Sequence, residues 1–282
     1  MQQNKDYFSI YNFIDKVSEE ENEDAVLYKE SKEGFKLAVS DGAGGAGIYC
    51  KTWADFLVNC QPEIPFENES IIQDWFLQNS KKFYKTNIDL INNSDPFIIE
   101  KFIKDGSYAT LLYVWWNSKT KLLSYTGIGD TTMFIFRKKN NDYIPILITP
   151  IDKQKTLDDF PKLLNWNKKL NYDLSRSEIE LKSDDILIIS TDSIARWIIY
   201  HLIILAPDHM LVLLNENIIK NKDINKTENF NLNNKYKSIS DLIQKIEVTM
   251  NTDLLNIKCM LEKQINLELL EKDDFTMFFK RF

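Results

Sequence analysis

The stretch VSDGAGGAG, residues 39–47, places one carboxylate, Asp41, directly before six residues that are all glycine or alanine. The chain of 282 residues has only 8 glycines, and four of them lie in this stretch. An ordinary turn does not need half of the glycine of a whole chain. The stretch therefore predicts a special site at Asp41, around which side chains are kept out.

The runs on either side predict how this stretch is held. Residues 25–31 and 35–41 are short apolar-rich runs, typical of a β-hairpin. Residues 48–60 and 70–91 carry apolar residues at helical spacing. We therefore expect Asp41 to end a strand and the glycine loop to lead into a helix.

The rest of the chain alternates β-rich runs and helices. Four runs are separated by polar turns too short for parallel crossovers, which predicts an antiparallel meander: 108–117, 121–130, 131–139 and 143–150. Beyond them we expect a strand, two helices and a final strand: 179–192, 195–205, 239–255 and 275–282.

Composition limits the class of protein. Hydrophobic residues make up 44% and charged residues 27%, as in a globular protein, and the net charge of −7 argues against a nucleic-acid partner. Three cysteines suggest neither a disulfide framework nor a zinc site, and the N-terminus lacks the pattern of a signal peptide. Pro207 and Asp208 interrupt the apolar stretch 197–214, which favours a buried helix pair over a membrane span. We expect a cytoplasmic monomer with no membrane partner.

No internal repeat or linker divides the chain, so we expect a single domain over residues 1–282. Residues 151–172 lack periodicity and suggest a loop or flap. Residues 215–237 are rich in Asn and Lys and suggest a loose surface insertion.

Further acidic residues stand next to strongly apolar β runs: Glu23, Asp24, Asp130, Asp192, Asp273 and Asp274. Any one of them is an ordinary turn residue. As a set at one end of a sheet they would repel one another, and a bound cation removes that cost. Because no His or Cys lies among them, Mg²⁺ or Mn²⁺ is expected rather than Zn²⁺.

Six sequence pieces occur in the order of the motifs of the PP2C-type metal-dependent protein serine/threonine phosphatases, and the chain resembles that family. The pieces are NEDA (22–25), VSDGAGGAG, GSYAT, GIGDTTMF, IISTDS and DDFTMFF. They extend from about residue 22 to residue 279, and the glycine-rich piece resembles the bacterial branch. The resemblance implies an α+β fold, an α-β-β-α sandwich of two antiparallel sheets flanked by helices.

The resemblance also implies site roles. Asp41 is expected to bridge two metal ions, and the backbone carbonyl of Gly42 to be a further ligand. Asp192 and Asp273 match the aspartates of the second metal. Three more positions are expected at the metals or their waters: Glu23, Asp24 and Asp130, the last of which orients water and can help to hold a third ion.

The implied reaction is hydrolysis of phosphoserine and phosphothreonine in proteins. Two Mn²⁺ or Mg²⁺ ions activate a shared water, which attacks phosphorus in line. The implied partners are a phosphorylated protein and a cognate serine/threonine kinase.

The chain departs from the family pattern at three positions. Glu19 stands where the family usually has a phosphate-binding arginine, Ser193 where many members have glycine, and Arg196 where an aspartate for a third metal is common. One hypothesis is that Arg196, one turn into a helix, supplies the missing guanidinium for phosphate. The alternative is that Arg196 only pairs with a neighbouring acid.

Two rival interpretations remain open. The lost arginine and the altered third-metal position would suit a catalytically impaired pseudophosphatase that acts as a binding or regulatory module. The glycines could instead form the phosphate cradle of a nucleotide-binding protein or another hydrolase, although no Lys-Ser/Thr pair follows them.

Overall fold

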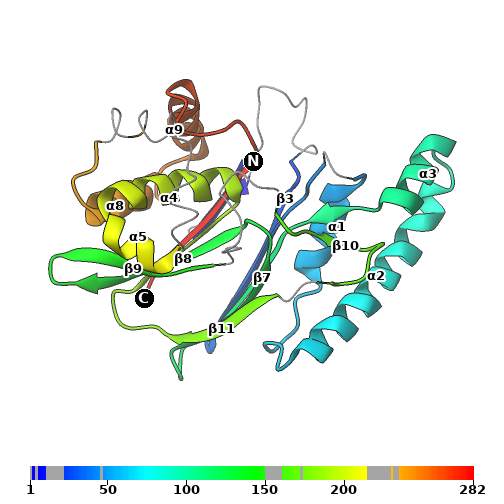
Figure 1. The fold of residues 1–282 in the computed structure, drawn as a ribbon, viewed down its shortest axis with the longest axis horizontal. Helices are drawn as coiled ribbons and strands as arrows, with labels where there is room; N and C mark the ends of the chain where they lie inside the picture. The colour runs from blue at the N-terminus through cyan, green and yellow to red at the C-terminus, as the bar shows by residue number, and fades with distance from the viewer. Residues whose placement is uncertain are drawn as a thin grey trace. The chain divides into compact units, whose positions relative to one another are not determined.

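The computed structural model describes residues 2–3, 6–10, 22–44, 47–149, 161–171, 174–214, 230 and 235–282. These residues group into two compact units (Figure 1). Unit 1 takes Met1–Glu19, Thr132–Pro161 and Lys182–Phe282, and unit 2 takes Glu20–Thr131 and Lys162–Leu181. Each unit contains one main antiparallel sheet with helices packed on it, which confirms the α+β class with two antiparallel sheets and flanking helices.

The main sheet of unit 2 has five strands in the order β11-β7-β6-β4-β3. Its strands are β3 (Asp24–Ser31), β4 (Gly34–Asp41), β6 (Leu111–Asn117), β7 (Leu122–Ile128) and β11 (Ser175–Glu180). A short ladder joins β5 (Tyr108–Ala109) to β10 (Leu164–Asn165).

The helices of unit 2 are α1 (Cys50–Asn59), α2 (Glu69–Ile91) and α3 (Pro96–Asp105). The Asn68 side chain accepts the Ile71 N–H at 3.0 Å and so caps the start of α2. Helix α1 packs on β3 and β4, and it buries Trp53, whose ring centroid lies 4.8 Å from that of Phe83. This aromatic core holds the helix that follows the glycine loop.

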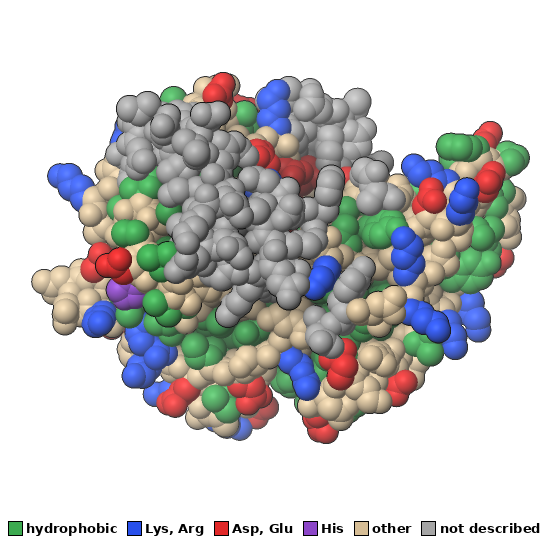
Figure 2. Space-filling model, in the orientation of Figure 1, with side chains coloured by type: hydrophobic (Ala, Val, Ile, Leu, Met, Phe, Trp, Pro, Cys, Tyr) green, Lys and Arg blue, Asp and Glu red, His purple; other side chains and the backbone are tan. Residues whose placement is uncertain are grey.

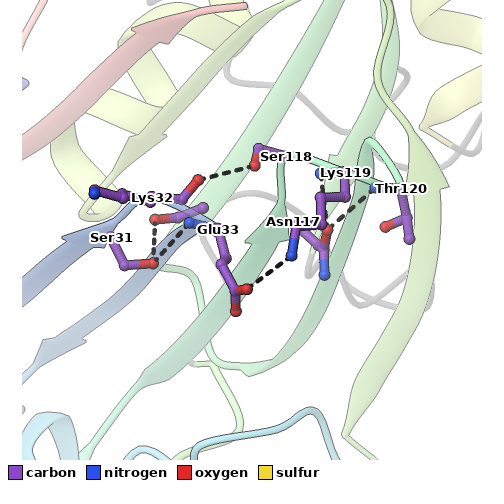
Figure 3. A network of polar contacts seen from close by, with 8 residues as sticks. Ser31, Lys32, Glu33, Asn117, Ser118, Lys119 and Thr120 are labelled. Carbon is purple, nitrogen blue, oxygen red and sulfur yellow. Dashed lines mark hydrogen bonds and ion pairs between the residues drawn. The ribbon is translucent and has the colours of Figure 1, made fainter.

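Two hairpin turns of unit 2 meet in a polar network far from Asp41 along β4 (Figure 3). The Ser118 N–H donates to the Glu33 carbonyl oxygen at 2.8 Å, and Lys119 Nζ pairs with the Glu33 carboxylate at 2.8 Å. The Glu33 N–H donates to Ser31 Oγ at 3.2 Å. Because both charged side chains are exposed, the ion pair adds little stability, and the network serves to hold the register of β4 against β6.

The sheet of unit 1 has six strands in the order β1-β2-β13-β12-β8-β9. Its strands are β1 (Gln2–Gln3), β2 (Tyr7–Ile10), β8 (Thr132–Lys139), β9 (Asp142–Thr149), β12 (Ile186–Ser190) and β13 (Phe275–Arg281). The last strand in sequence, β13, thus lies inside the sheet, between β2 and β12.

The helices of unit 1 are α4 (Asp192–Leu205), α5 (Pro207–Leu213), α8 (Ile239–Met250) and α9 (Leu254–Asn266). Helices α4 and α5 occupy the apolar stretch 197–214, but only α4 is largely buried as expected, because α5 exposes Leu211 and Val212. None of the described helices combines the length and apolarity needed to cross a bilayer. On the face drawn in Figure 2, acidic and basic side chains are interspersed among the described atoms.

Three expectations about elements were wrong. The meander predicted for 108–150 is broken, because β7 belongs to unit 2 and β8 to unit 1; Gly129 lies at this crossing with φ +101°, a conformation that favours glycine. The strand predicted for 179–192 is two strands in different sheets, β11 and β12. The helix predicted for 239–255 ends at Met250, and α9 follows it.

The predicted flap and insertion lie largely outside the described residues. Of residues 151–172, the structure describes 161–171, which contain β10. Of residues 215–237, it describes Phe230 and 235–237.

His201 is a buried histidine on α4. It is 2% exposed, and its ring nitrogens have no hydrogen-bond partner among the described residues. The ring centroids of Trp197, Phe230 and Tyr236 lie 4.6, 5.0 and 4.9 Å from that of His201. Burial lowers the pKa of His201 to about 4 because the charged imidazolium loses its hydration.

We expect His201 to make the protein less stable in weak acid. The unfolded chain takes up this proton near pH 6.5 and the folded chain only near pH 4, so stability is fully present above pH 6.5 and falls as the pH drops towards 4. The loss at the acid end is about 3 kcal/mol. Urea unfolding at about pH 7 and about pH 5 should show a smaller acid loss for His201→Phe than for the parent chain. The exposed His209→Gln variant is the control, and an unchanged pH dependence in His201→Phe would contradict this account.

Candidate metal centre

Two carboxylates face each other at one end of the unit 2 sheet. Asp24 and Asp41 are directly opposite partners in the β3–β4 ladder. Asp24 is 4% exposed, and Asp41 is half-buried. Like charges directly opposite each other destabilise an antiparallel pair, and burial increases the cost. This arrangement suits a divalent cation that takes oxygen ligands.

The loop after β4 is held by its own main chain. The Gly42 N–H donates to the Glu23 carbonyl oxygen at 3.1 Å. The Ala43 N–H donates to the Tyr108 carbonyl oxygen at 3.0 Å, and the Gly44 N–H donates to that of Gly42 at 3.1 Å. A phosphate cradle needs N–H groups that point at the ligand, so these bonds argue against the nucleotide-binding interpretation. The Gly42 carbonyl keeps a second lone pair for a ligand.

Neighbouring atoms leave no room for a side chain at three glycines of this loop. A Cβ at Gly42 would lie 2.8 Å from the backbone carbonyl of Cys50, in the first turn of α1. A Cβ at Gly44 would meet the carboxylate of Glu23, and one at Gly47 would lie 2.6 Å from the Gly106 carbonyl oxygen. The bare loop therefore lets α1 and Glu23 approach closely, a reason that the sequence did not reveal.

Cys50 lies beneath the loop as a structural thiol. It is buried and donates to the Ala43 carbonyl oxygen at 3.2 Å. Burial raises the pKa of the Cys50 thiol to about 11, so it carries little thiolate near neutral pH.

Thr110 ties Asp41 to neighbouring segments. Its Oγ1 accepts the Asp41 N–H at 2.8 Å, and its own N–H donates to the Asp41 carbonyl oxygen at 2.8 Å. Its Oγ1 also lies 2.6 Å from Thr131 Oγ1, and both threonines are buried. Sequence reasoning gave these threonines no role, although each stands in a quoted motif.

Asp130 lies in the turn that leaves β7 and is half-exposed. A Cβ at Gly129, directly before it, would lie 2.6 Å from the Thr110 side chain. The turn that carries Asp130 thus packs on the residue that holds Asp41.

Unit 1 holds a second acidic pair, Asp192 at the start of α4 and Asp273 before β13. The Thr191 N–H donates to the Thr276 carbonyl oxygen at 3.1 Å, and the Thr276 N–H donates to Thr191 Oγ1 at 3.1 Å. Burial, and next the charge of Asp192, raises the pKa of Asp273 to about 7; a hydrogen bond to Asp192 acts in the same direction. A buried carboxyl beside another acid resists ionisation, and a bound cation would favour its charged form.

Arg196 contacts two acids of unit 1. Its Nη2 pairs with Asp192 Oδ2, and its Nη1 lies 2.7 Å from Glu271 Oε2. The structure therefore shows the acid pairing that was the alternative to phosphate binding. The predicted role of Arg196 towards phosphate stays a prediction.

Of the predicted ligands, the structure pairs Asp24 with Asp41 in unit 2 and Asp192 with Asp273 in unit 1. All their donors are oxygen atoms, which fits Mg²⁺ or Mn²⁺. Over the part of the chain that the structure describes, no group of three or more His, Cys, Asp or Glu side chains could hold a metal ion. Glu19 lies outside the described residues.

No protein-family profile and no curated protein matches the chain. Solved structures similar to it include the S. agalactiae serine/threonine phosphatase, at 12% identity and a TM-score of 0.47, with 98% of this chain and 99% of that chain covered. The catalytic domain of the serine/threonine protein phosphatase PstP with two manganese ions is 11% identical, with a TM-score of 0.46 and 97% and 95% covered. RsbX in complex with magnesium is 13% identical, with a TM-score of 0.44 and 99% and 96% covered. Two of these structures are named as serine/threonine phosphatases.

Proposed function

We propose that this chain is a Mg²⁺- or Mn²⁺-dependent phosphatase that acts on phosphoserine and phosphothreonine in proteins. The observation that carries the proposal is Asp24 directly opposite Asp41 at the end of a sheet, followed at once by a loop of glycine and alanine. The raised pKa of Asp273 beside Asp192 supports it, because a bound cation lowers the cost of placing carboxylates close together.

The site residues have different proposed roles. Asp41 and the Gly42 carbonyl would hold a cation in unit 2, while Asp192 and Asp273 would hold a cation in unit 1. The carboxylates of Glu23, Asp24 and Asp130 hold cations or orient water. Bound divalent cations lower the pKa of water and offset charge on phosphoryl oxygens.

The reaction proposed is hydrolysis without a covalent enzyme intermediate. Water adds to phosphorus, and the bond from phosphorus to the serine or threonine oxygen breaks. The products are inorganic phosphate and the free hydroxyl of the protein substrate, whose oxygen takes up a proton released by the attacking water. We propose that a serine/threonine kinase supplies these substrates in the cytoplasm and that the chain acts as a monomer.

Removal of metal tests this function. We expect the protein to release inorganic phosphate from phosphoserine and phosphothreonine peptides in Mn²⁺ or Mg²⁺. Dialysis against EDTA should reduce the rate to background, and added Mn²⁺ should restore it, because the carboxylates cannot activate water alone. An equal rate in EDTA rules the proposal out.

The pseudophosphatase is the second candidate, and the contact of Arg196 with Asp192 favours it. A guanidinium on a predicted ligand reduces the attraction for a cation. If the chain binds a phosphopeptide yet releases no phosphate from it or from p-nitrophenyl phosphate in Mn²⁺, the pseudophosphatase is the better description.

A further inference from the structure

Two departures from the phosphatase pattern meet at one residue, Glu271. Ser193 Oγ donates to the backbone carbonyl oxygen of Glu271 at 3.0 Å. Arg196 Nη1 donates to the Glu271 carboxylate at 2.7 Å. The start of α4, which carries Asp192, is therefore fastened to the segment just before Asp273 by a main-chain and a side-chain contact.

The same arginine engages Asp192. Its Nη2 donates to Asp192 Oδ2, one helical turn earlier, in the favourable order of acid before base. Asp192 Oδ1 accepts the Ser193 N–H at 2.5 Å. Both oxygens of this carboxylate are thus engaged by groups of α4.

We infer that Arg196 is a built-in counter-ion that competes with a divalent cation for Asp192, and that Glu271 sets how strongly it competes. The inference rests on the proposed function, because it takes Asp192 to be a metal ligand. The guanidinium occupies a carboxylate oxygen that the cation needs. Its positive charge would also repel a cation bound to the same carboxylate. Arg196 is therefore a positioning residue for Asp192.

Glu271 gives the guanidinium a second place to bind. The Glu271 side chain is 46% exposed and that of Arg196 23%, so both lie at the edge of the core, where a long side chain can move. When a cation takes Asp192, Glu271 retains the arginine. If Glu271 is removed, Asp192 is the one of these two acceptors that remains. Arg196 then competes more strongly with the cation for Asp192.

Titration of the metal-free chain with Mn²⁺, measured by calorimetry, tests the inference through binding alone. Arg196→Met is expected to bind Mn²⁺ about ten-fold more tightly than the parent chain, and Glu271→Gln about three-fold more weakly. The change in charge alone would shift the Mn²⁺ affinity of each single variant in the same direction as competition by Arg196. The double variant therefore distinguishes the two explanations. With Met at position 196, Glu271→Gln should change the affinity less than about two-fold, because no arginine is left to redirect.

Arg281→Met is the matched control, since Arg281 pairs with Glu247 at 2.6 Å in the same unit. The affinity of this variant for Mn²⁺ should equal that of the parent chain. If circular dichroism shows that Arg196→Met is unfolded, Arg196→Gln replaces it. We expect Arg196→Gln to have the Mn²⁺ affinity predicted for Arg196→Met. Additive effects in the double variant, or unchanged affinity in Arg196→Met while the parent binds Mn²⁺, overturn this inference and leave the proposed function standing. No Mn²⁺ binding by any variant overturns both.

Discussion

Replacing Asp41 with asparagine is expected to reduce Mn²⁺-dependent turnover of phosphopeptides by on the order of 10³-fold. Asparagine keeps the shape of aspartate but loses the charge that attracts a cation. Because Asp24 lies directly opposite, the change also removes a like-charge pair. In EDTA, the variant should therefore resist urea at least as well as the parent chain, so activity is lost without loss of fold.

Two comparisons make this result specific to metal binding. Asp74→Asn, on the exposed side of α2 in the same unit, should keep the parent turnover. Added Mn²⁺ should raise the melting temperature of the parent chain more than that of Asp41→Asn, since a ligand stabilises the state that binds it. If Asp41→Asn keeps its turnover within about ten-fold, Asp41 is not the ligand on which catalysis depends.

Gly42→Ala is expected to lower the free energy of unfolding by about 2 kcal/mol or more. The new methyl group would lie 2.8 Å from the backbone carbonyl of Cys50, and backbone atoms in the first turn of α1 cannot move aside cheaply. Either α1 shifts off the sheet or β4 bends at its end. Urea unfolding in EDTA measures the loss without any contribution from metal.

Gly44→Ala is the matched comparison two residues away. Its methyl group would meet the carboxylate at the far end of the Glu23 side chain, which can rotate away. We expect a loss below about 1 kcal/mol, together with weaker Mn²⁺ binding if Glu23 is a ligand. Equal losses in the two variants would show that the packing of α1 is not what requires glycine at position 42.

The local part of the site could be predicted from sequence. The runs on either side of Gly34 predict a hairpin. Asp24 and Asp41 stand at its open end, one on each strand. A short turn fixes the register of such a pair, so the two carboxylates must come to the same end. The helix after the glycines followed from apolar spacing alone.

The remainder depends on contacts between distant parts of the chain. Thr110 holds Asp41 across 69 residues, and Arg196 reaches Glu271 across 75. Neither contact leaves a periodic signal. The split between β11 and β12 was missed for a related reason, because the short polar break after Glu180 does not show that the next strand joins another sheet.

The interior place of β13 has a consequence for a chain that is made from its N-terminus. All strands of the unit 2 sheet have been synthesised once Glu180 has left the ribosome, so the Asp24–Asp41 ladder can form early. In unit 1, β13, the strand that lies between β2 and β12, is missing until residues 275–281 have been synthesised. During translation we therefore expect the nascent polypeptide to carry unpaired strand edges on β2 and β12 until β13 is made, a period in which a chaperone would be most useful.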